Sequence, residues 1–385
     1  MENRFPRSVR FSFLLVSVIL LIYVIIQAKQ FLYPLAFGFL LAYMLYPVVN
    51  FLEKRDVPRI LSIITGLVIV IAVIYGAGFF IFRRIGTLME DMPSLKKQAL
   101  DNVDVFLQSI QATFGIKDNK LEDFLRDSVN GMFQTGSQEF KQMFMHTTGA
   151  LIKILLLPIY VFLFLYYRTK FSYFILKMVN DGKRLVTIKI LREISTVATR
   201  YMGGIFIVAI CLCIMNSIGF SIIGLKYPIF MGIIAAIFSF IPYFGTLMGY
   251  IIPFVFSLLA MNSPMYAVAI VVQYFIVHLI ENNLLTPNIV GDKLQINPFF
   301  IIIGLIGAAM VWGVPGMMII VPALAIAKII FENIDSLHPF AYLLGPKGTK
   351  RHALSLENVR QRFVKIKKIL SRRKILKDKR TTSLN

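Results

Sequence analysis

Two long apolar runs, residues 228–260 and 298–331, decide the fold of this chain, and each is interrupted near its middle. The first break reads Ile241-Pro242-Tyr243-Phe244-Gly245-Thr246, and the second reads Trp312-Gly313-Val314-Pro315-Gly316. A straight helix over either run would be about 50 Å long, whereas the hydrocarbon core of a bilayer is about 30 Å thick. Because proline interrupts a helix and glycine permits a reversal, each run is predicted to form two half-helices that meet at a tip inside the membrane, as a re-entrant hairpin.

The two runs also resemble each other in the placement of their prolines. Pro228 and Pro298 open them, and a further proline follows in each, at Pro253 and Pro322. Paired interrupted segments in corresponding positions are typical of the substrate sites of secondary transporters. The alternative is two kinked membrane-spanning helices with no site between them, since proline often only bends such helices.

The composition is that of a polytopic membrane protein. The chain has 385 residues, of which 57% are hydrophobic, and a mean hydropathy of +0.73, more apolar surface than a soluble domain could bury. We therefore predict an all-α fold of about eight hydrophobic segments, two of them re-entrant hairpins in an inverted repeat. The two cysteines, Cys211 and Cys213, lie in one apolar segment, so no disulfide framework is expected.

Residues 1–82 are predicted to form three membrane helices. Basic residues precede the apolar run 11–26, and no small-residue cleavage site follows it, so we expect an uncleaved helix with its amino end in the cytoplasm. A hairpin turn is expected to lead into a second helix over 31–51. A short basic loop, also cytoplasmic, then leads into the third helix over 60–82.

Residues 83–148 differ in composition and are predicted to form an extracytoplasmic region of amphipathic helices. They hold eight Lys/Arg and nine Asp/Glu, and their apolar residues recur at helical spacing. A packed exterior cap is favoured over a ligand-binding domain.

Residues 149–200 are expected to contain a fourth membrane helix and a basic cytoplasmic segment, and residues 201–335 the transport core. The core begins with a fifth membrane helix, which carries the buried polar residue Asn216. Two topologies remain open: six full crossings with two re-entrant hairpins, or eight full crossings. Both place the carboxyl end in the cytoplasm.

The predicted cytoplasmic tail, residues 336–385, is strongly basic, with fourteen Lys/Arg against two Asp/Glu over residues 346–385. Apolar residues at helical spacing among these charges predict an amphipathic helix that binds anionic lipids on the inner leaflet. The net charge of the chain, +21, is thus assigned to the membrane surface, and no motif points to nucleic acid.

The sequence carries no motif for enzymatic or metal chemistry. No GxxxxGK[ST] phosphate loop, HExxH pair or paired-cysteine motif occurs, and the four histidines are scattered. We expect no enzymatic activity, no metal and no cofactor.

One polar cluster stands out, at the end of the apolar segment 265–280. Tyr274, His278 and Glu281 share one helix face, and Asn282 follows. An acidic residue at membrane depth indicates a functional site, because burying its charge is costly. The alternative is that Glu281 only caps a helix end at the interface, since Pro287 predicts that the helix ends soon afterwards.

The same region carries a family resemblance. Residues 281–291, ENNLLTPNIVG, resemble the E-N-x(4)-P-x-I/L-x-G signature of the autoinducer-2 exporter family. IPYFG at 241–245 and GVPG at 313–316, with Pro322, are similar to further motifs of that family, although Thr246 stands where many members have proline. The resemblance covers nearly the whole chain. It implies a bacterial inner-membrane secondary transporter that forms homo-oligomers; some members are associated with export of autoinducer-2, and others behave as Na⁺(Li⁺)/H⁺ antiporters.

We therefore predict export of a small polar organic molecule across the bacterial inner membrane, with both termini cytoplasmic. The alternatives are Na⁺(Li⁺)/H⁺ antiport and a membrane scaffold that transports nothing. The two tips are expected to face each other across a cavity, where free backbone groups bind substrate. The predicted substrate-binding residues are Pro242, Tyr243, Gly245, Thr246, Asn216, Gly313, Pro315 and Gly316. The predicted coupling residues, which would exchange H⁺ or Na⁺, are Glu281, His278 and Asn282.

Overall fold

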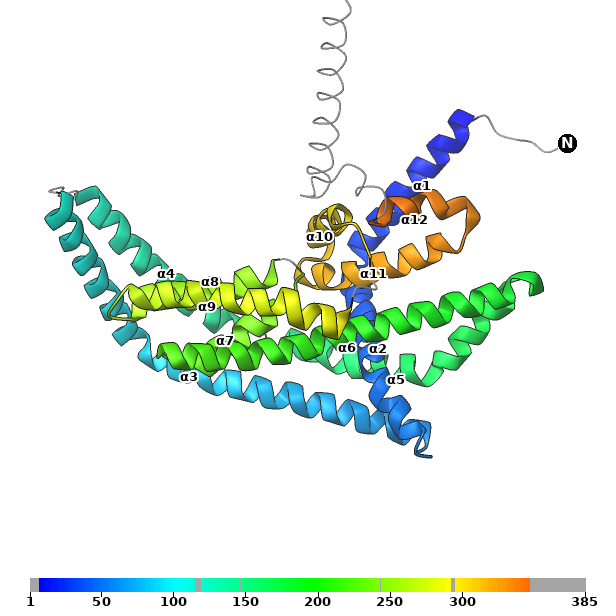
Figure 1. The fold of residues 1–385 in the computed structure, drawn as a ribbon, viewed down its shortest axis with the longest axis horizontal. Helices are drawn as coiled ribbons and strands as arrows, with labels where there is room; N and C mark the ends of the chain where they lie inside the picture. The colour runs from blue at the N-terminus through cyan, green and yellow to red at the C-terminus, as the bar shows by residue number, and fades with distance from the viewer. Residues whose placement is uncertain (1–6, 115–118, 146, 243, 292–294, 347–385) are drawn as a thin grey trace, which may run out of the picture.

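The computed structural model describes residues 7–114, 119–145, 147–242, 244–291 and 295–346. Every regular element within these ranges is a helix. Five of these helices are long and apolar enough to cross a membrane: Lys29–Glu53, Arg59–Thr113, Asp181–Ile223, Met265–Val290 and Val314–Glu332. The predicted class, an all-α polytopic membrane protein, is confirmed by these helices (Figure 1).

The first two helices, α1 (Arg7–Gln27) and α2 (Lys29–Glu53), are joined by a bend at Ala28. The Ala28 amide donates to the Val24 carbonyl at 2.8 Å, and the Leu32 amide donates to the Ala28 carbonyl at 2.9 Å. Helical hydrogen bonds therefore continue through the junction, and the predicted hairpin turn between these segments is wrong. The physical reason is local: Gln27-Ala28-Lys29 contains neither glycine nor proline to reverse the chain.

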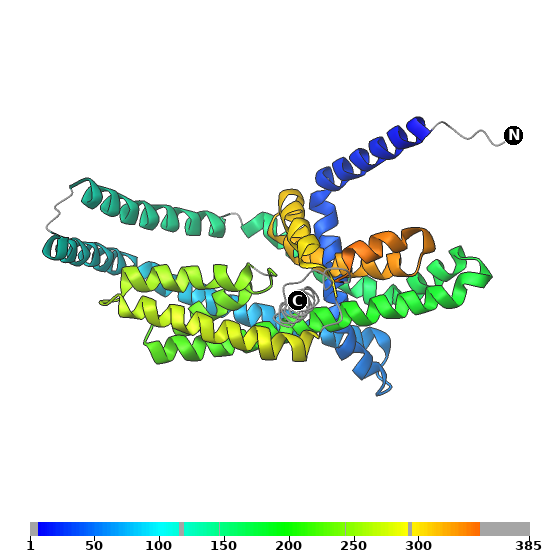
Figure 2. The ribbon, with the colours of Figure 1, turned by 45° about the horizontal axis from the view of Figure 1, so that its top comes forward.

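The third helix, α3 (Arg59–Phe114), continues without a break past the expected end of the membrane segment at residue 82. At 1.5 Å per residue its 56 residues span about 84 Å, far more than the membrane requires. After it comes α4 (Asn119–Met145), and Ala99 and Val103 of α3 are buried against Val129 of α4. We call residues 83–114 together with α4 the arm, which extends beyond the other helices in both views (Figures 1 and 2).

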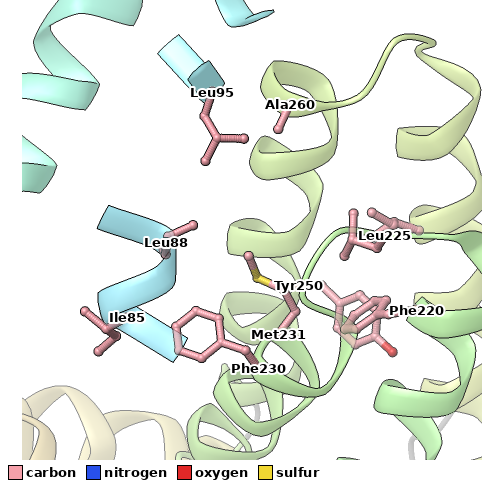
Figure 3. Close-up of a cluster of buried hydrophobic side chains, with 10 residues drawn as sticks. Ile85, Leu88, Leu95, Phe220, Leu225, Phe230, Met231, Tyr250 and Ala260 are labelled. Carbon is pink, nitrogen blue, oxygen red and sulfur yellow. The ribbon is translucent and has the colours of Figure 1, made fainter. Parts of the chain in front are cut away.

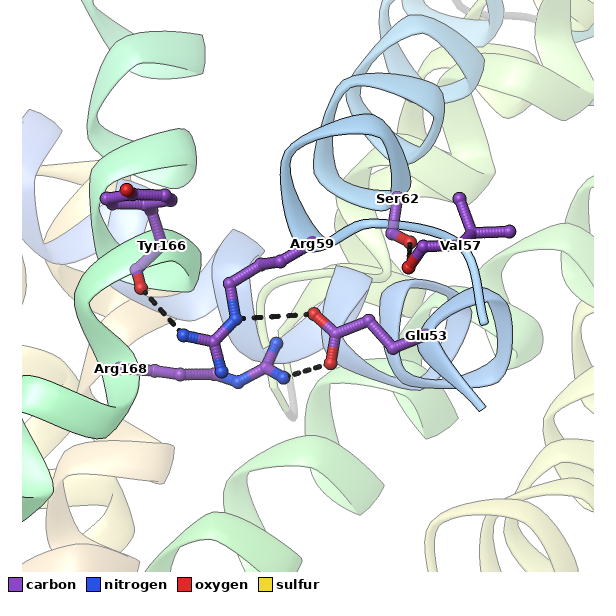
Figure 4. A network of polar contacts seen from close by, with 6 residues as sticks. All are labelled: Glu53, Val57, Arg59, Ser62, Tyr166 and Arg168. Carbon is purple, nitrogen blue, oxygen red and sulfur yellow. Dashed lines mark hydrogen bonds and ion pairs between the residues drawn. The ribbon is translucent and has the colours of Figure 1, made fainter. Parts of the chain in front are cut away.

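A polar network joins α2 and α3 to α5 (Thr147–Met178) (Figure 4). Glu53, at the end of α2, pairs with Arg168, and its Oε1 lies 3.5 Å from the Arg59 Nε. Arg59 also donates from Nη1 to the Tyr166 carbonyl at 3.2 Å. The short loop between α2 and α3 is thus tied to α5 from both of its ends.

The centre of the molecule is a layer of helices built on α6 (Arg184–Ile223), which follows a short 3₁₀ turn, η1 (Asp181–Lys183). It packs against α7 (Pro228–Phe238) and against α9 (Met265–Ile280), which continues as η2 (Glu281–Val290). The Gln273 Nε2 donates to the Asn216 carbonyl at 3.3 Å, and a Cβ at Gly204 would lie 3.0 Å from the Val290 Cα. Later residues of α9–η2 therefore meet earlier residues of α6, so the two run antiparallel (Figure 1).

The first interrupted run forms α7 and α8 (Gly245–Ala260), which pack against each other and which we call the first hairpin. A Cβ at Gly249 would lie 2.8 Å from the Ala235 Cα, and one at Gly245 would lie 2.0 Å from the Phe238 carbonyl oxygen. Only glycine permits so close an approach of the two backbones. The same contacts show that α7 and α8 are antiparallel.

The second interrupted run forms α10 (Pro298–Trp312) and α11 (Val314–Glu332), the second hairpin. A Cβ at Gly304 would lie 2.9 Å from the Ile320 side chain, and one at Gly316 would lie 2.3 Å from the Ala308 carbonyl oxygen. These two helices are therefore also antiparallel. With 19 residues, α11 is about 28 Å long, close to the thickness of the hydrocarbon core.

The chain then passes through η4 (Asp335–Leu337) to α12 (His338–Leu344), which packs back on α11. The Asn297 amide, at the start of α10, donates to the Leu344 carbonyl at 2.7 Å. Residues 347–385 lie outside the described residues, so the lipid-binding tail helix stays a prediction.

The arm lies against the first hairpin along an apolar seam (Figure 3). Ile85, Leu88 and Leu95 of α3 belong to one buried cluster with Phe230 of α7 and Ala260 of α8. The seam therefore reaches both the beginning and the end of the first hairpin.

Polar contacts flank this seam and involve both ends of the first hairpin. Asp91 accepts a hydrogen bond from the Tyr227 hydroxyl, and its Oδ2 lies 2.9 Å from the Lys226 Nζ. Further along α3, Gln98 donates to the Asn262 side chain at 2.5 Å. Both ends of the first hairpin thus contact one short stretch of α3.

Asn102 makes a third set of polar contacts between α3 and the first hairpin. We call Asp91, Gln98 and Asn102, together with the hairpin residues that they contact, the hairpin clasp. The Asn102 Nδ2 lies within hydrogen-bonding distance of three carbonyl oxygens at the end of α8, those of Leu258 (3.3 Å), Leu259 (3.1 Å) and Met261 (2.8 Å). The last carbonyls of a helix have no partner within the helix, so Asn102 supplies a donor that α8 lacks.

Replacing Asn102 by leucine is therefore expected to destabilise the protein by about 1–2 kcal/mol, because the carbonyls at the end of α8 lose their donor. Thermal unfolding in a mild detergent would measure this loss. Ser109→Ala is the matched control, since the Ser109 hydroxyl bonds only within the exposed part of α3. Equal melting temperatures for both variants would show that the clasp contributes no stability.

Candidate functional site

The segment that carries the family resemblance, Glu281–Val290, forms a π-helix that continues α9. At its end the Gly291 amide donates to the Thr286 carbonyl at 3.1 Å, five residues earlier. Pro287 lies within this helix, which ends at Val290, so the expectation that the helix ends soon after this proline is confirmed. Proline in an α-helix clashes with the carbonyl four residues before it, and the wider π-helical winding relieves that clash. Such segments are rare and occur frequently at functional sites.

A cavity of about 560 Å³ lies beside this π-helix. Its walls come from α6, the turn of the first hairpin, α8, α9, η2, α10 and α11. The lining residues are Tyr201, Ile205, Val208, Ser239, Pro242, Thr246, Leu247, Tyr274, His278, Glu281, Asn282, Thr286, Val290, Gly291, Ile301 and Val321. This volume suits a small organic molecule.

Five of the predicted site residues meet at this cavity. Pro242 and Thr246 come from the first hairpin, and His278, Glu281 and Asn282 from the end of α9 and the start of η2. The sequence places them in two separate motifs, and the antiparallel packing of the core brings these motifs together.

Three other predicted residues are placed differently. Gly245 lies in the turn but does not line the cavity, because its Cα faces the Phe238 backbone. Asn216 is buried, does not line the cavity, and accepts a hydrogen bond from the Tyr250 hydroxyl. Tyr243 lies outside the described residues.

The tip of the second hairpin is not at this cavity, which corrects the expectation that the two tips face each other. Gly313, Pro315 and Gly316 are absent from its lining. The neighbouring Trp312 donates from its indole to the Ile25 carbonyl of α1 at 3.2 Å. The second hairpin instead contributes Ile301 of α10 and Val321 of α11, which share a buried cluster with residues of α6.

The cavity wall contains a carboxylic acid beside a histidine. The Asn282 Nδ2 lies 2.9 Å from the His278 Nε2, and the His278 Nδ1 lies 3.9 Å from the Glu281 Oε2. The Tyr274 ring stacks on the His278 ring, with centroids 5.3 Å apart. The Glu281 side chain is only 15% exposed, and its Oε2 has no hydrogen-bond partner among the described residues. A buried carboxyl group without a donor is poised to take a proton or pair with a cation.

Sequence reasoning missed several lining residues. Ser239 lies just before the break at 241–246, and Thr286 lies within the motif at 281–291. Their position in the sequence was therefore a usable signal for both residues. Tyr201, Ile301 and Val321 sit in ordinary apolar helices and carry no local signal. Their part in the site arises only from helix packing.

Comparison with known proteins identifies the family of this chain. Residues 15–336 match the model of the family described as AI-2E family transporter. Two Bacillus subtilis (strain 168) proteins that are named as candidate transport proteins are similar. YueF is 27% identical over 320 residues, which cover 80% of this chain and 86% of YueF. YrrI is 27% identical over 313 residues, covering 78% of this chain and 86% of YrrI.

A similar protein also occurs in Borreliella burgdorferi, 22% identical over 317 residues, with 81% of this chain and 84% of that protein covered. The family match includes both hairpins, the arm and the π-helical motif. The chain therefore belongs to the AI-2E transporter family.

Proposed function

We propose that the protein is a secondary transporter that exports a small polar organic molecule, such as an autoinducer-2-like signalling compound or a metabolite. The observation that carries this proposal is the cavity of about 560 Å³ between the first hairpin, the π-helix and the second hairpin. It combines apolar walls with a few polar groups, as small-molecule sites do. Family membership supports transport as the activity.

Flux into proteoliposomes tests this proposal directly. Purified protein is reconstituted, a proton gradient is imposed, and uptake of candidate hydroxylated solutes is measured against protein-free liposomes. Solute movement that follows the gradient is expected. Absence of flux for every solute and ion would favour a membrane scaffold.

Na⁺(Li⁺)/H⁺ antiport is the second candidate, and the buried Glu281 carboxyl beside His278 favours it. Carboxylate oxygens suit hard cations, and loss of the cation would allow the group to take a proton. A change of internal pH that depends on sodium or lithium, in the absence of any organic solute, would identify this activity.

We further propose that the first hairpin is re-entrant. Its helices, of 11 and 16 residues, are about 16 and 24 Å long, shorter than the hydrocarbon core. Both of its ends contact the same stretch of α3 through the hairpin clasp. The second hairpin is proposed to enter from the cytoplasmic side, so that helix-plus-hairpin occurs twice in opposite orientation, an inverted repeat. The antiparallel packing of α6 and α9 supports this arrangement.

Cysteine labelling is expected to place both ends of the first hairpin on the outer side. Ile229, at the start of α7, and Met265, just after α8, are exposed, and Asp181, whose side chain is 96% exposed, serves as the cytoplasmic control. After replacement of Cys211 and Cys213 by alanine, a membrane-impermeant maleimide should label Ile229→Cys and Met265→Cys in intact cells. Asp181→Cys should react only after permeabilisation. Labelling of the first two from opposite sides would contradict the hairpin topology.

We also propose a homo-oligomer with both termini in the cytoplasm, held by the N-terminal helices and the arm. Support comes from the resemblance to a family whose members form homo-oligomers, and from the two hairpins, whose tips would stay free to move if the interface lies elsewhere. Native mass spectrometry in mild detergent is expected to detect a multimer. A purely monomeric spectrum, or crosslinks concentrated at the two hairpins, would refute this assembly.

A further inference from the structure

The described lining of the cavity is unbalanced in charge. Its acidic residue is Glu281, and no Lys or Arg stands among the lining residues. Of the basic residues on the surrounding helices, Arg200 of α6 is exposed, and Lys328 of α11 pairs with Glu332 at 3.5 Å. A negative charge formed in this cavity therefore has no permanent counter-ion among the described residues.

His278 does not supply that counter-ion in its neutral form. The Asn282 Nδ2 is a donor, so the His278 Nε2 that it contacts at 2.9 Å accepts, and the proton of the neutral ring is on Nδ1. That nitrogen faces the Glu281 Oε2 at 3.9 Å, which is too long for a hydrogen bond. Both atoms are buried without a partner among the described residues. The site thus offers, within the described part of the chain, one unpartnered acceptor, the Glu281 Oε2, and one unpartnered donor, the His278 Nδ1–H.

The rest of the wall supplies neutral polar groups and an aromatic surface. Ser239, Thr246 and Thr286 contribute hydroxyl groups, and Tyr274, stacked on His278, contributes an aromatic ring. Hydroxyl groups bind polar solutes of any charge, whereas an aromatic face and a buried carboxylate both favour a cation. An anion that entered this low-dielectric cavity would lose its hydration and find no Lys or Arg among the described lining residues, so its binding is strongly disfavoured.

We infer that this cavity selects its solute by charge, accepting a small organic molecule with one ammonium group and rejecting anions. The inference rests on the proposed transport and narrows its substrate class. In the empty site Glu281 holds a proton; on binding, that proton leaves to water and the carboxylate pairs with the ammonium N–H groups. When the ammonium compound leaves, the carboxylate takes up a proton again. One proton is exchanged for one cation, so the charge of the site is the same in both states.

Three molecules of nearly equal shape test this inference: tyramine, a cation; tyrosol, its neutral alcohol counterpart; and 4-hydroxyphenylacetate, an anion. Each is titrated into full-length protein in lipid nanodiscs, with thermal stabilisation as the readout. Tyramine is expected to bind at least about tenfold more tightly than tyrosol. A gain of this size corresponds to one charge-assisted hydrogen bond between the ammonium group and the Glu281 carboxylate. The anion is expected to produce no shift. In weakly buffered solution, tyramine binding should release protons.

Two variants separate the carboxyl group from general effects on the protein. Glu281→Gln keeps the size of the side chain and is expected to remove both the preference for tyramine and the proton release. Glu193→Gln, at an exposed position of α6, should behave as the wild type. Equal binding of the three molecules, no binding of tyramine, or an unchanged preference in Glu281→Gln would each overturn the inference. If the charge preference holds but tyramine does not move in proteoliposomes, the site inference stands and the proposed transport fails.

Discussion

Replacement of Glu281 by glutamine is expected to reduce proton-coupled flux to the level of protein-free liposomes while leaving the protein folded and inserted. Glutamine fills the same space but can neither release nor take up a proton. The Glu281 Oε2 has no hydrogen-bond partner among the described residues, so the substitution breaks no hydrogen bond to this oxygen. Proton-driven uptake in proteoliposomes measures the effect, with expression level and melting temperature as checks on folding.

The control for this experiment is Glu193→Gln, which removes a carboxyl group from an exposed position of α6 and should retain full flux. Downhill movement of a neutral solute should continue in Glu281→Gln, because the cavity keeps its shape. Normal proton-coupled flux in that variant would mean that Glu281 serves only as a polar cap of α9.

Substitution of Gly245 by valine is expected to have the second large effect, loss of both stability and transport. A Cβ at this position would lie 2.0 Å from the Phe238 carbonyl oxygen and 2.8 Å from the Ser239 Cα. These are backbone atoms, so relief requires opening the turn between α7 and α8. Overpacking of this kind costs about 1–3 kcal/mol or more. Since Pro242 and Thr246 flank the same turn, the cavity wall would move as well.

Gly307→Val is the matched control, since a Cβ at Gly307 in α10 meets no atom within 4 Å. Its melting temperature and flux should stay close to those of the wild type, whereas Gly245→Val should lower both. A Gly245→Val protein with wild-type stability would show that the turn adopts another conformation. The expected loss of transport arises from distortion of the turn and not from filling of the cavity, because Gly245 does not line it.

Much of the architecture was predictable from the sequence because it depends on local features. Hydrophobic length identifies membrane helices, and Pro242 with Gly245 interrupts one long run just as Gly313 with Pro315 interrupts the other. The spacing of Tyr274, His278 and Glu281 places them on one helix face, and these three residues do line one cavity. Family membership also followed from short motifs, since such motifs are contiguous in the chain.

Tertiary packing decided what local patterns leave open. The first tip meets the π-helix because α6 and α9 are antiparallel, and the second tip lies near α1 because α11 packs along α6. The expected end of the third helix at residue 82 is a further example. The chain becomes more polar there but keeps helical spacing, so its composition changes while α3 continues. The sequence by itself determined where the two long apolar runs are interrupted and which polar side chains share one helix face. Only the three-dimensional structure decided which of them share a cavity, because contacts between distant segments depend on how whole helix surfaces fit together.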